Sequence, residues 1–272
     1  MKAAITLLRR VRAFIVRDFQ LAISYRLEFF LRMLTILLVV TTFFFISQIF
    51  TGQAGVQFTQ WRNPLAAWIT GLAVLNYFMT GFSSLANAIR AEQTQGTLES
   101  VLLTPINVPT VIVASSAWDF VQATFNSFLY LFFGWFFFGV HYEGSFLLAL
   151  VFLILTTLVL ASLGILSASF AMVFKRGDPF GIILGTGSAL FSGVFFPTQL
   201  LGKGFGVVSR LLPPTYGLDG IRRVLIEGQT LPEVREPLVV LLLYLVVLLP
   251  FSLWVFKRAV RRAKREGSLI QY

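Results

Sequence analysis

Long apolar runs alternate with short polar segments along almost the whole chain. An α-helix rises 1.5 Å per residue, so about 20 apolar residues cross the hydrocarbon core of a bilayer. The pattern therefore predicts an all-α integral membrane protein in which residues 1–272 form a single transmembrane domain. The predicted transmembrane helices, six in number, are residues 29–50, 65–89, 108–140, 146–174, 180–196 and 237–255.

Two further apolar segments do not have the pattern of a span. Residues 4–27 predict an amphipathic interface helix, with Ile15 and Phe19 on its apolar stripe and Arg10 and Arg17 opposite, and such a helix lies in the headgroup region of a membrane. Residues 197–228 have too many glycines and prolines for a span and are too apolar for an aqueous loop. Irregular backbone at membrane depth needs protein or trapped water to satisfy it. We therefore expect re-entrant short helices between spans five and six.

Composition and charge agree with this topology. The chain is 57% hydrophobic and 12% charged, whereas soluble domains have about 45–50% and about 25%. The net charge of +10 comes from basic residues that lie between and beside the spans, such as Lys175 and Arg176. Membrane topology explains them better than nucleic-acid binding, because Lys and Arg are enriched in cytoplasmic loops. With an even number of spans, both termini are expected in the cytoplasm.

The sequence lacks the residues that catalysis, metal binding and ATP hydrolysis usually require. The chain has no cysteine and one histidine, His141, so we expect no catalytic residues and no metal site. The phosphate-binding motif of an ATPase is missing too, because Gly202-Lys203 lacks the upstream glycine. Any ATP hydrolysis would therefore belong to another polypeptide.

A polar stripe lies in the third predicted span. Asp119, Gln122 and Asn126 follow Ser115 at intervals of four, three and four residues, which places them on one helical face. A carboxylate at membrane depth costs about 2.5–3.5 kcal/mol on insertion scales, so Asp119 should face protein or water. Two interpretations stay open: the stripe lines a substrate pathway, at a cytoplasmic vestibule or at the seam between two subunits, or it packs helices close enough to the surface for Asp119 to be hydrated.

A polar interruption separates the second and third spans. Within residues 94–104, Leu98 and Leu102 share the apolar face of a short helix, and Pro105 ends it. By itself this pattern is typical of an ordinary interfacial helix. Together with the residues around it, the segment resembles the coupling helix of type-2 export permeases of ATP-binding-cassette (ABC) transporters, which docks into a separate ATPase subunit. The residues that carry the resemblance are Glu92, Gln95, Gly96, Thr97, Leu98, Glu99, Leu102 and Leu103. The resemblance implies that these residues couple the chain to the ATPase.

A second motif is similar to the end of the same family's membrane domain. It runs from Ser192 to Pro197 and from Leu212 to Arg222, with a final glycine at Gly228. Where family members usually have Pro-Leu-Thr-Tyr, this chain has Pro-Pro-Thr-Tyr. The resemblance implies an outer gate in the re-entrant segment, comprising Gly193, Pro197, Pro214, Tyr216, Asp219 and Arg222, beside pathway residues Phe191, Phe195 and Phe196.

The resemblance implies a permease subunit of an ATP-driven exporter for an amphiphile such as a lipid-linked glycan, a lipid or a drug. It implies a homodimer of permeases with two cytoplasmic ATPase subunits in a bacterial or archaeal cytoplasmic (inner) membrane. ATP and Mg would bind the ATPase, and this chain would hold no cofactor. The alternatives are an ion-coupled secondary transporter using Asp119, although the two halves of the chain are not similar, and a structural scaffold, which would not require the coupling segment.

Overall fold

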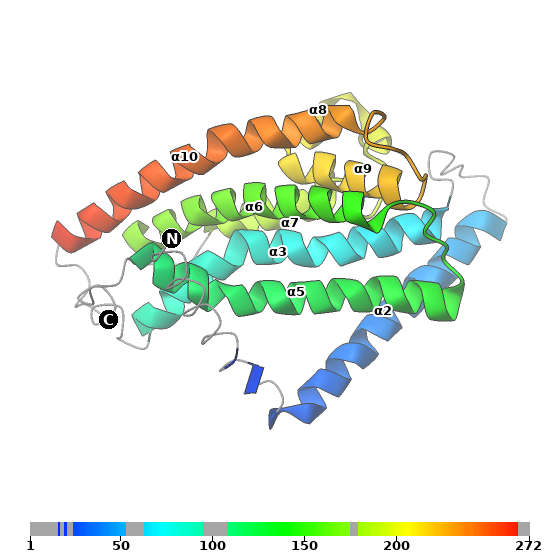
Figure 1. The fold of residues 1–272 in the computed structure, drawn as a ribbon, viewed down its shortest axis with the longest axis horizontal. Coiled ribbons are helices and arrows are strands. Elements are labelled where there is room, and N and C mark those ends of the chain that lie inside the picture. Colours follow the sequence, from blue (N-terminus) through cyan, green and yellow to red (C-terminus); the bar gives the residue numbers. More distant parts are fainter. Residues whose placement is uncertain are drawn as a thin grey trace.

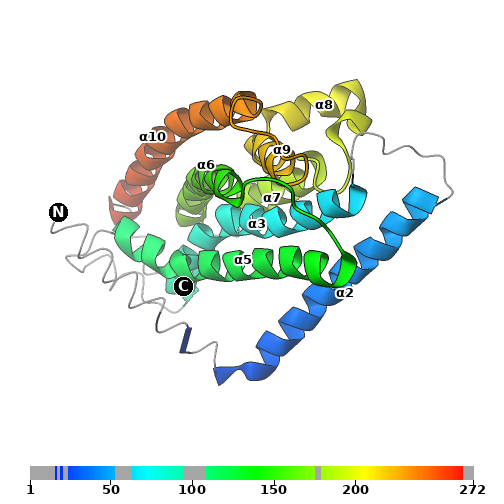
Figure 2. The same cartoon turned by 45° about the vertical axis from the view of Figure 1, so that its right-hand side comes forward.

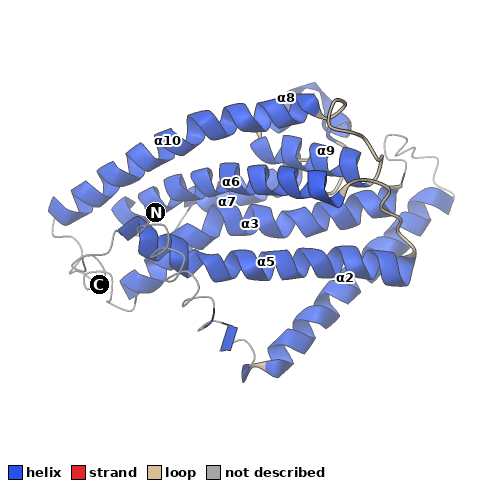
Figure 3. Ribbon diagram, in the orientation of Figure 1, coloured by secondary structure: helices blue, strands red, loops and turns tan. Residues whose placement is uncertain are grey.

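The fold is known from a computed structural model, which describes residues 16, 19–20, 24–52, 63–94, 108–174 and 179–265. Within these ranges all regular structure is helical, and the rest is loop and turn (Figure 3). The helices are α2 (Arg26–Gly52), α3 (Pro64–Thr94), α5 (Val108–Phe138), α6 (Phe146–Phe174), α7 (Pro179–Phe191), the 3₁₀ helix η1 (Thr198–Leu201), α8 (Gly202–Leu211), α9 (Pro213–Leu225) and α10 (Arg235–Arg265).

Helix α3 lies at the centre of the bundle. It packs between α5 and α6, while α9 and α10 cover the other side of α6 (Figure 1). Helix α2 crosses outside the bundle at an angle in both views (Figures 1 and 2) and touches α5 through the rings of Phe29 with Phe125 and Phe44 with Phe138. The last turns of α3, α6 and α10 and the start of α5 lie together at the left end of Figure 1.

Small residues allow the central helices to approach closely. A Cβ atom added to Gly164 of α6 would lie 2.1 Å from the carbonyl oxygen of Gly81 in α3. A Cβ on Gly217 of α9 would lie 2.1 Å from Oγ1 of Thr156 in α6. Dispersion contacts between close backbones stabilise helix packing in lipid, where the hydrophobic effect does not. The glycines thus set the distances of α3 and α9 from α6.

Five helices within the described residues are long and apolar enough to cross a membrane. The qualifying stretches are Arg26–Ile49, Pro64–Ala88, Ser116–Phe138, Phe146–Phe170 and Arg235–Arg262. They correspond to the predicted spans one, two, three, four and six, so the chain is a multi-pass membrane protein.

The fifth predicted span, 180–196, is helical only as far as Phe191. Helix α7 has 13 residues, and residues 192–196 form bends. Gly193 has φ +88°, a conformation that side chains with a Cβ rarely adopt, and this ends the helix. The prediction of one continuous helix over 180–196 was therefore wrong in its extent, and a sixth span stays a prediction.

Other boundaries also differ from the predicted ones. Helix α3 continues through the polar residue Arg90 to Thr94, past the predicted end at residue 89. Helix α5 ends at Phe138, two residues before the predicted end, where Gly139 has φ +65°. Helix α10 continues ten residues beyond the predicted end at 255 and includes the basic segment that follows the apolar run.

Residues 197–228 contain two short helices, as the sequence predicted, namely α8 and α9 after the 3₁₀ turn η1. Their entry into a membrane leaflet stays a prediction. Most of the predicted interface helix 4–27 and most of the predicted coupling helix 94–104 lie outside the described residues. Val16, Phe19, Gln20 and Ser24 are helical, and Tyr25 is not.

Candidate functional site

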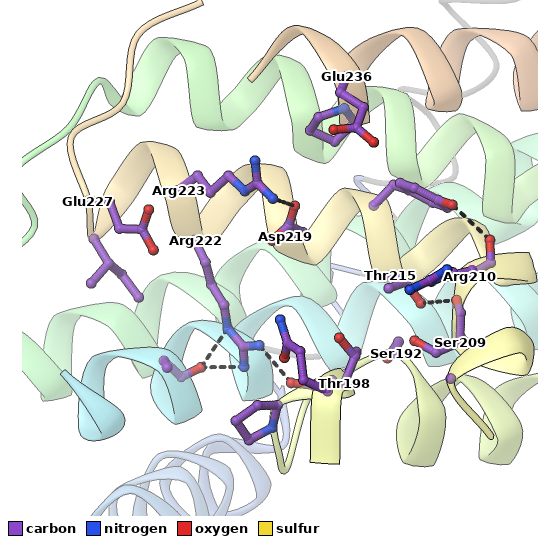
Figure 4. Close-up of a pocket in the computed structure, with 18 of the residues that line it drawn as sticks. Ser192, Thr198, Ser209, Arg210, Thr215, Asp219, Arg222, Arg223, Glu227 and Glu236 are labelled. Carbon is purple, nitrogen blue, oxygen red and sulfur yellow. Dashed lines mark hydrogen bonds and ion pairs between the residues drawn. The ribbon is translucent and has the colours of Figure 1, made fainter. Parts of the chain in front are cut away.

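A cavity of about 950 Å³ lies at the end of the bundle where α3 and α10 begin. We call it the Arg222 cavity (Figure 4). Polar groups from the start of α3, the bends after α7, the short helices α8 and α9, and the start of α10 line it. It includes five of the six residues predicted to form the gate, namely Gly193, Pro197, Tyr216, Asp219 and Arg222. The sixth, Pro214, is buried in the first turn of α9.

Arg222 joins three segments through its guanidinium group (Figure 4). Its Nε and Nη2 donate to the carbonyl oxygen of Ala67 in α3 at 3.1 and 2.7 Å. Its Nη1 donates to the carbonyl oxygen of Gly193 at 2.6 Å, and Nη2 also donates to that of Val194 at 3.2 Å. The unwound backbone after α7 thereby gains partners for carbonyls that no helix satisfies.

The close approach of this guanidinium depends on a glycine in α3. A Cβ on Gly71 would lie 2.8 Å from Nη2 of Arg222 and 2.9 Å from the carbonyl oxygen of Val194. Burial lowers the pKa of Arg222 to about 9, with the nearby Asp219 carboxylate opposing the shift. The group is therefore cationic at neutral pH, and its N–H groups remain donors.

The remaining charges of α9 are more exposed. Arg223 pairs with Asp219 at 2.9 Å, one helical turn away, and both side chains are at least one-third exposed. Burial raises the pKa of Asp219, and the positive charge of Arg223 opposes the rise. Helix α9 is also tied to α8, because the Tyr216 hydroxyl donates to the carbonyl oxygen of Arg210 at 2.9 Å. In this cavity Arg222 is thus fixed by hydrogen bonds to backbone carbonyls, whereas the Arg223–Asp219 ion pair is partly exposed to solvent.

The three phenylalanines predicted to line a pathway lie beside this cavity and do not line it. The ring of Phe191 stacks on Phe205 of α8 with centroids 5.4 Å apart. Phe195 accepts a hydrogen bond at its carbonyl oxygen from Nε1 of Trp68 at 2.6 Å, and Phe196 is half-buried. Their positions fit an apolar packing layer around the bends that follow α7.

The polar stripe of α5 lines a second, smaller cavity of about 210 Å³ between α3 and α5. We call it the Asn126 cavity. Asp119, Gln122 and Asn126 face it together, as their spacing predicted. Helix α2 reaches the same place, since Nη1 of Arg32 donates to Oε1 of Gln122 at 2.6 Å. The opposite wall, on α3, comprises Asn76, Thr80, Ser83, Ser84 and Asn87.

The residues predicted to couple to an ATPase are almost all outside the described part of the chain. Glu92 lies in the last turn of α3. The others, Gln95, Gly96, Thr97, Leu98, Glu99, Leu102 and Leu103, fall within residues 95–107, which connect α3 to α5. Their predicted role stays a prediction.

The sequence model of the family described as "ABC-2 type transporter" matches residues 9–226, which include α2, α3, α5, α6, α7, α8 and α9. The chain belongs to the ABC-2 type transporter family. A comparison with curated proteins finds no match. The resemblance inferred from the coupling and gate motifs is thus confirmed for the family. The chain is an ABC-2 type permease, a membrane component distinct from the ATPase subunit with which such domains typically pair.

The sequence interpretation of this permease missed the α3 wall of the Asn126 cavity and the acceptors of Arg222. On α3, Asn76, Thr80, Ser83 and Asn87 are spaced four, three and four residues apart, the same spacing as the stripe of α5, and that periodicity could have revealed them. The acceptors of Arg222 could not have been found, because Ala67, Gly193 and Val194 contribute backbone carbonyls that any residue carries.

Proposed function

We propose that this ABC-2 type permease is the membrane-spanning subunit of an ATP-driven exporter, and that it moves an amphiphile out of the cytoplasm. The match to the family over residues 9–226 carries the proposal. The chain would act as a homodimer with two copies of a cytoplasmic ATPase subunit, which would bind ATP and Mg. The exported amphiphile would be a lipid-linked glycan, a lipid or a drug.

Charge at the helix ends supports a cytoplasmic position for the coupling segment. The end of the bundle where α3 stops and α5 starts also holds the last turns of α10 (Figure 1). There, Lys257, Arg258, Arg261 and Arg262 are exposed. Because basic residues accumulate on the cytoplasmic side, residues 94–104 would face the cytoplasm of a bacterial or archaeal cell. Both termini would be cytoplasmic, and the Arg222 cavity would open on the outer side.

Helix α3 offers a direct mechanical connection between the two ends. Its 31 residues span about 46 Å at 1.5 Å per residue. At one end it leads into the coupling segment, and at the other its Ala67 carbonyl accepts two hydrogen bonds from Arg222. Closure of the ATPase subunits would push on residues 94–104 and displace α3, and Arg222 would pass the displacement to the bends at residues 192–196.

This movement would open an outer gate made by the bends and by α8 and α9, which we propose are re-entrant helices. Helix α7, with the bends that follow it, would then form a short fifth of six spans. A packed bundle is bistable, so a ligand-driven change at one end can select a different packing at the other.

Co-purification tests the proposal. The tagged permease would be isolated from its native membrane as wild type, as the double variant Gly96→Pro with Leu98→Asp, and as the control variant Leu231→Asp, which changes an exposed leucine in the loop before α10. We expect an ATPase to accompany wild type and control and to be lost from the double variant, which should still insert and dimerise. If no ATPase accompanies the wild type, the proposal fails, and an ion-coupled carrier using Asp119 becomes the function to test.

A further inference from the structure

The Asn126 cavity holds the polar stripe of α5, for which the sequence left two interpretations open. Apart from Asp119, its described polar lining is neutral, made of amide and hydroxyl side chains from α3 and α5. Polar side chains inside a membrane domain are costly unless they are hydrogen-bonded, and they face the bundle interior or a water-filled cavity rather than lipid. Here, two helices each contribute several such groups to one space.

Two oxygen atoms of the lining are buried without a hydrogen-bond partner among the described residues. They are Oγ of Ser84, whose residue is 2% exposed, and Oδ1 of Asn126. A buried polar group without a partner destabilises the fold. Ser84 belongs to the α3 wall and Asn126 to the α5 wall, so a polar ligand that extends along the cavity could satisfy both. These atoms are the observation that points to a ligand.

The cavity is closed at one end and accessible at the other. At the end nearer the Arg222 cavity, just past Asn126, the Ser127 hydroxyl donates to the carbonyl oxygen of Ala73 at 2.5 Å, and beside the lining the Tyr77 hydroxyl donates to Oγ1 of Thr124 at 2.6 Å. These bonds join α3 to α5 there. In the opposite direction, Asn87 and Asp119 are exposed. A ligand would therefore enter from the end of the bundle where the coupling segment lies.

The size and charge of the cavity limit the ligand. Its volume of about 210 Å³ equals the liquid volume of about seven water molecules at about 30 Å³ each, which is the scale of one sugar ring. A bare metal ion needs oxygen ligands within about 2.6 Å and would leave most of this space empty. An anionic group would lie beside the Asp119 carboxylate, and the guanidinium of Arg32, which bonds to Gln122 at this cavity, is already paired with Glu28.

We propose that the Asn126 cavity binds a neutral, hydroxyl-rich head group of about one sugar ring, belonging to the amphiphile that the permease exports. Amide side chains both donate and accept hydrogen bonds, as hydroxyl groups do, and the carboxylate of Asp119 accepts from two hydroxyls. The inference rests on the proposed function, because it names the substrate class of the exporter. The apolar part of the amphiphile would lie against lipid-exposed side chains of α5.

Retention of a glycolipid by the purified permease tests this proposal without requiring the ATPase. The full-length protein would be purified in detergent and incubated on affinity resin with radiolabelled monoglucosyl diacylglycerol, or with diacylglycerol as the probe that lacks the sugar, and the label that remains after washing would be counted. The variants are Asn126→Leu and Ser84→Ala. The matched control is Ser162→Ala, a fully buried serine of α6 that bonds to its own helix outside the cavity.

We expect the wild type and the control to retain the glucosyl lipid in preference to diacylglycerol, and both cavity variants to retain it about tenfold less, as the loss of hydrogen bonds to a ligand predicts. Without lipid probe, the unfolding midpoint of Asn126→Leu should equal or exceed that of wild type, since an apolar group replaces an unpaired oxygen. Lost binding with unimpaired stability distinguishes a ligand site from a packing stripe.

Three results would overturn the proposal. The first is equal retention of the two lipids by wild type. The second is retention by the cavity variants at the wild-type level, which would leave the cavity to water. The third is an unfolding midpoint of the wild type that rises with sodium chloride but not with choline chloride. If Asn126→Leu does not show this rise, the cavity binds a cation. If the ATPase still co-purifies in any of these cases, only the substrate inference fails.

Discussion

Replacing Arg222 tests how the bends after α7 are held. In Arg222→Met the side chain keeps much of its apolar length but loses every donor. The carbonyl oxygens of Gly193 and Val194 lose the partners that the guanidinium supplied, and that of Ala67 loses two bonds. Gly193 and Val194 are buried, so their carbonyl oxygens are largely shielded from bulk water.

The expected loss follows from these contacts. A hydrogen bond from a charged donor contributes about 1.5–3 kcal/mol, but bonds that share one group are not additive. A buried carbonyl left without a donor costs about 1–3 kcal/mol, and three carbonyls are affected, so we expect Arg222→Met to cost about 3–5 kcal/mol in total. Arg222→Lys keeps the charge but loses the planar fork, and should cost about half as much.

The neighbouring residue provides the control. Arg223→Met removes an ion pair with Asp219 that is partly exposed, and such pairs contribute about 0–1 kcal/mol. The assay is thermal unfolding of the purified permease followed by tryptophan fluorescence, in which 3–5 kcal/mol corresponds to a fall of about 10 °C in the midpoint. Equal midpoints for Arg222→Met and Arg223→Met would refute the assignment of Arg222 as the clamp between α3 and the bends.

The same assay checks two further predictions. Gly217→Ala should destabilise the permease by about 1–3 kcal/mol, because its Cβ would meet the Thr156 side chain at 2.1 Å. The control Gly204→Ala adds a Cβ with no neighbour within 4 Å, so it should be neutral or stabilise the permease by up to about 1 kcal/mol. A larger loss of stability in Gly204→Ala than in Gly217→Ala would contradict the packing of α9 on α6. Trp68→Phe should cost about 1 kcal/mol, because it keeps an aromatic ring but loses the bond from Nε1 to the carbonyl oxygen of Phe195; an unchanged midpoint would show that this bond contributes nothing.

Hydropathy predicted the long helices well and failed where tertiary contacts end a helix. Helix α6 begins and ends at the predicted residues, Phe146 and Phe174, because polar or turn-forming segments flank its apolar run. Residues 180–196 are almost uniformly apolar, so no change in hydropathy indicated the end of α7 at Phe191. The unwound carbonyls that follow are satisfied by Arg222, 28 or 29 residues later in the chain. Such a partner is visible only in three dimensions.

The candidate sites show the same limit. The spacing of Asp119, Gln122 and Asn126 predicted that they share a face, and they line one cavity. The opposing wall on α3 has the same periodicity, but which helix faces which is decided by packing. The coupling segment and the gate were inferred from resemblance, and the family match supports the permease assignment without testing the role of single residues.

The central claim is that residues 94–104 face an ATPase in the cytoplasm while the opposite end of the bundle faces outward. The chain has no cysteine, so single cysteines can be labelled without background. In intact cells, a membrane-impermeant maleimide should label His141→Cys, in the loop between α5 and α6, and leave Gln95→Cys unlabelled. Gln95→Cys should instead cross-link to a co-purifying ATPase after lysis. Labelling of Gln95→Cys from outside, with no cross-linked partner, would contradict both the orientation and the coupling role.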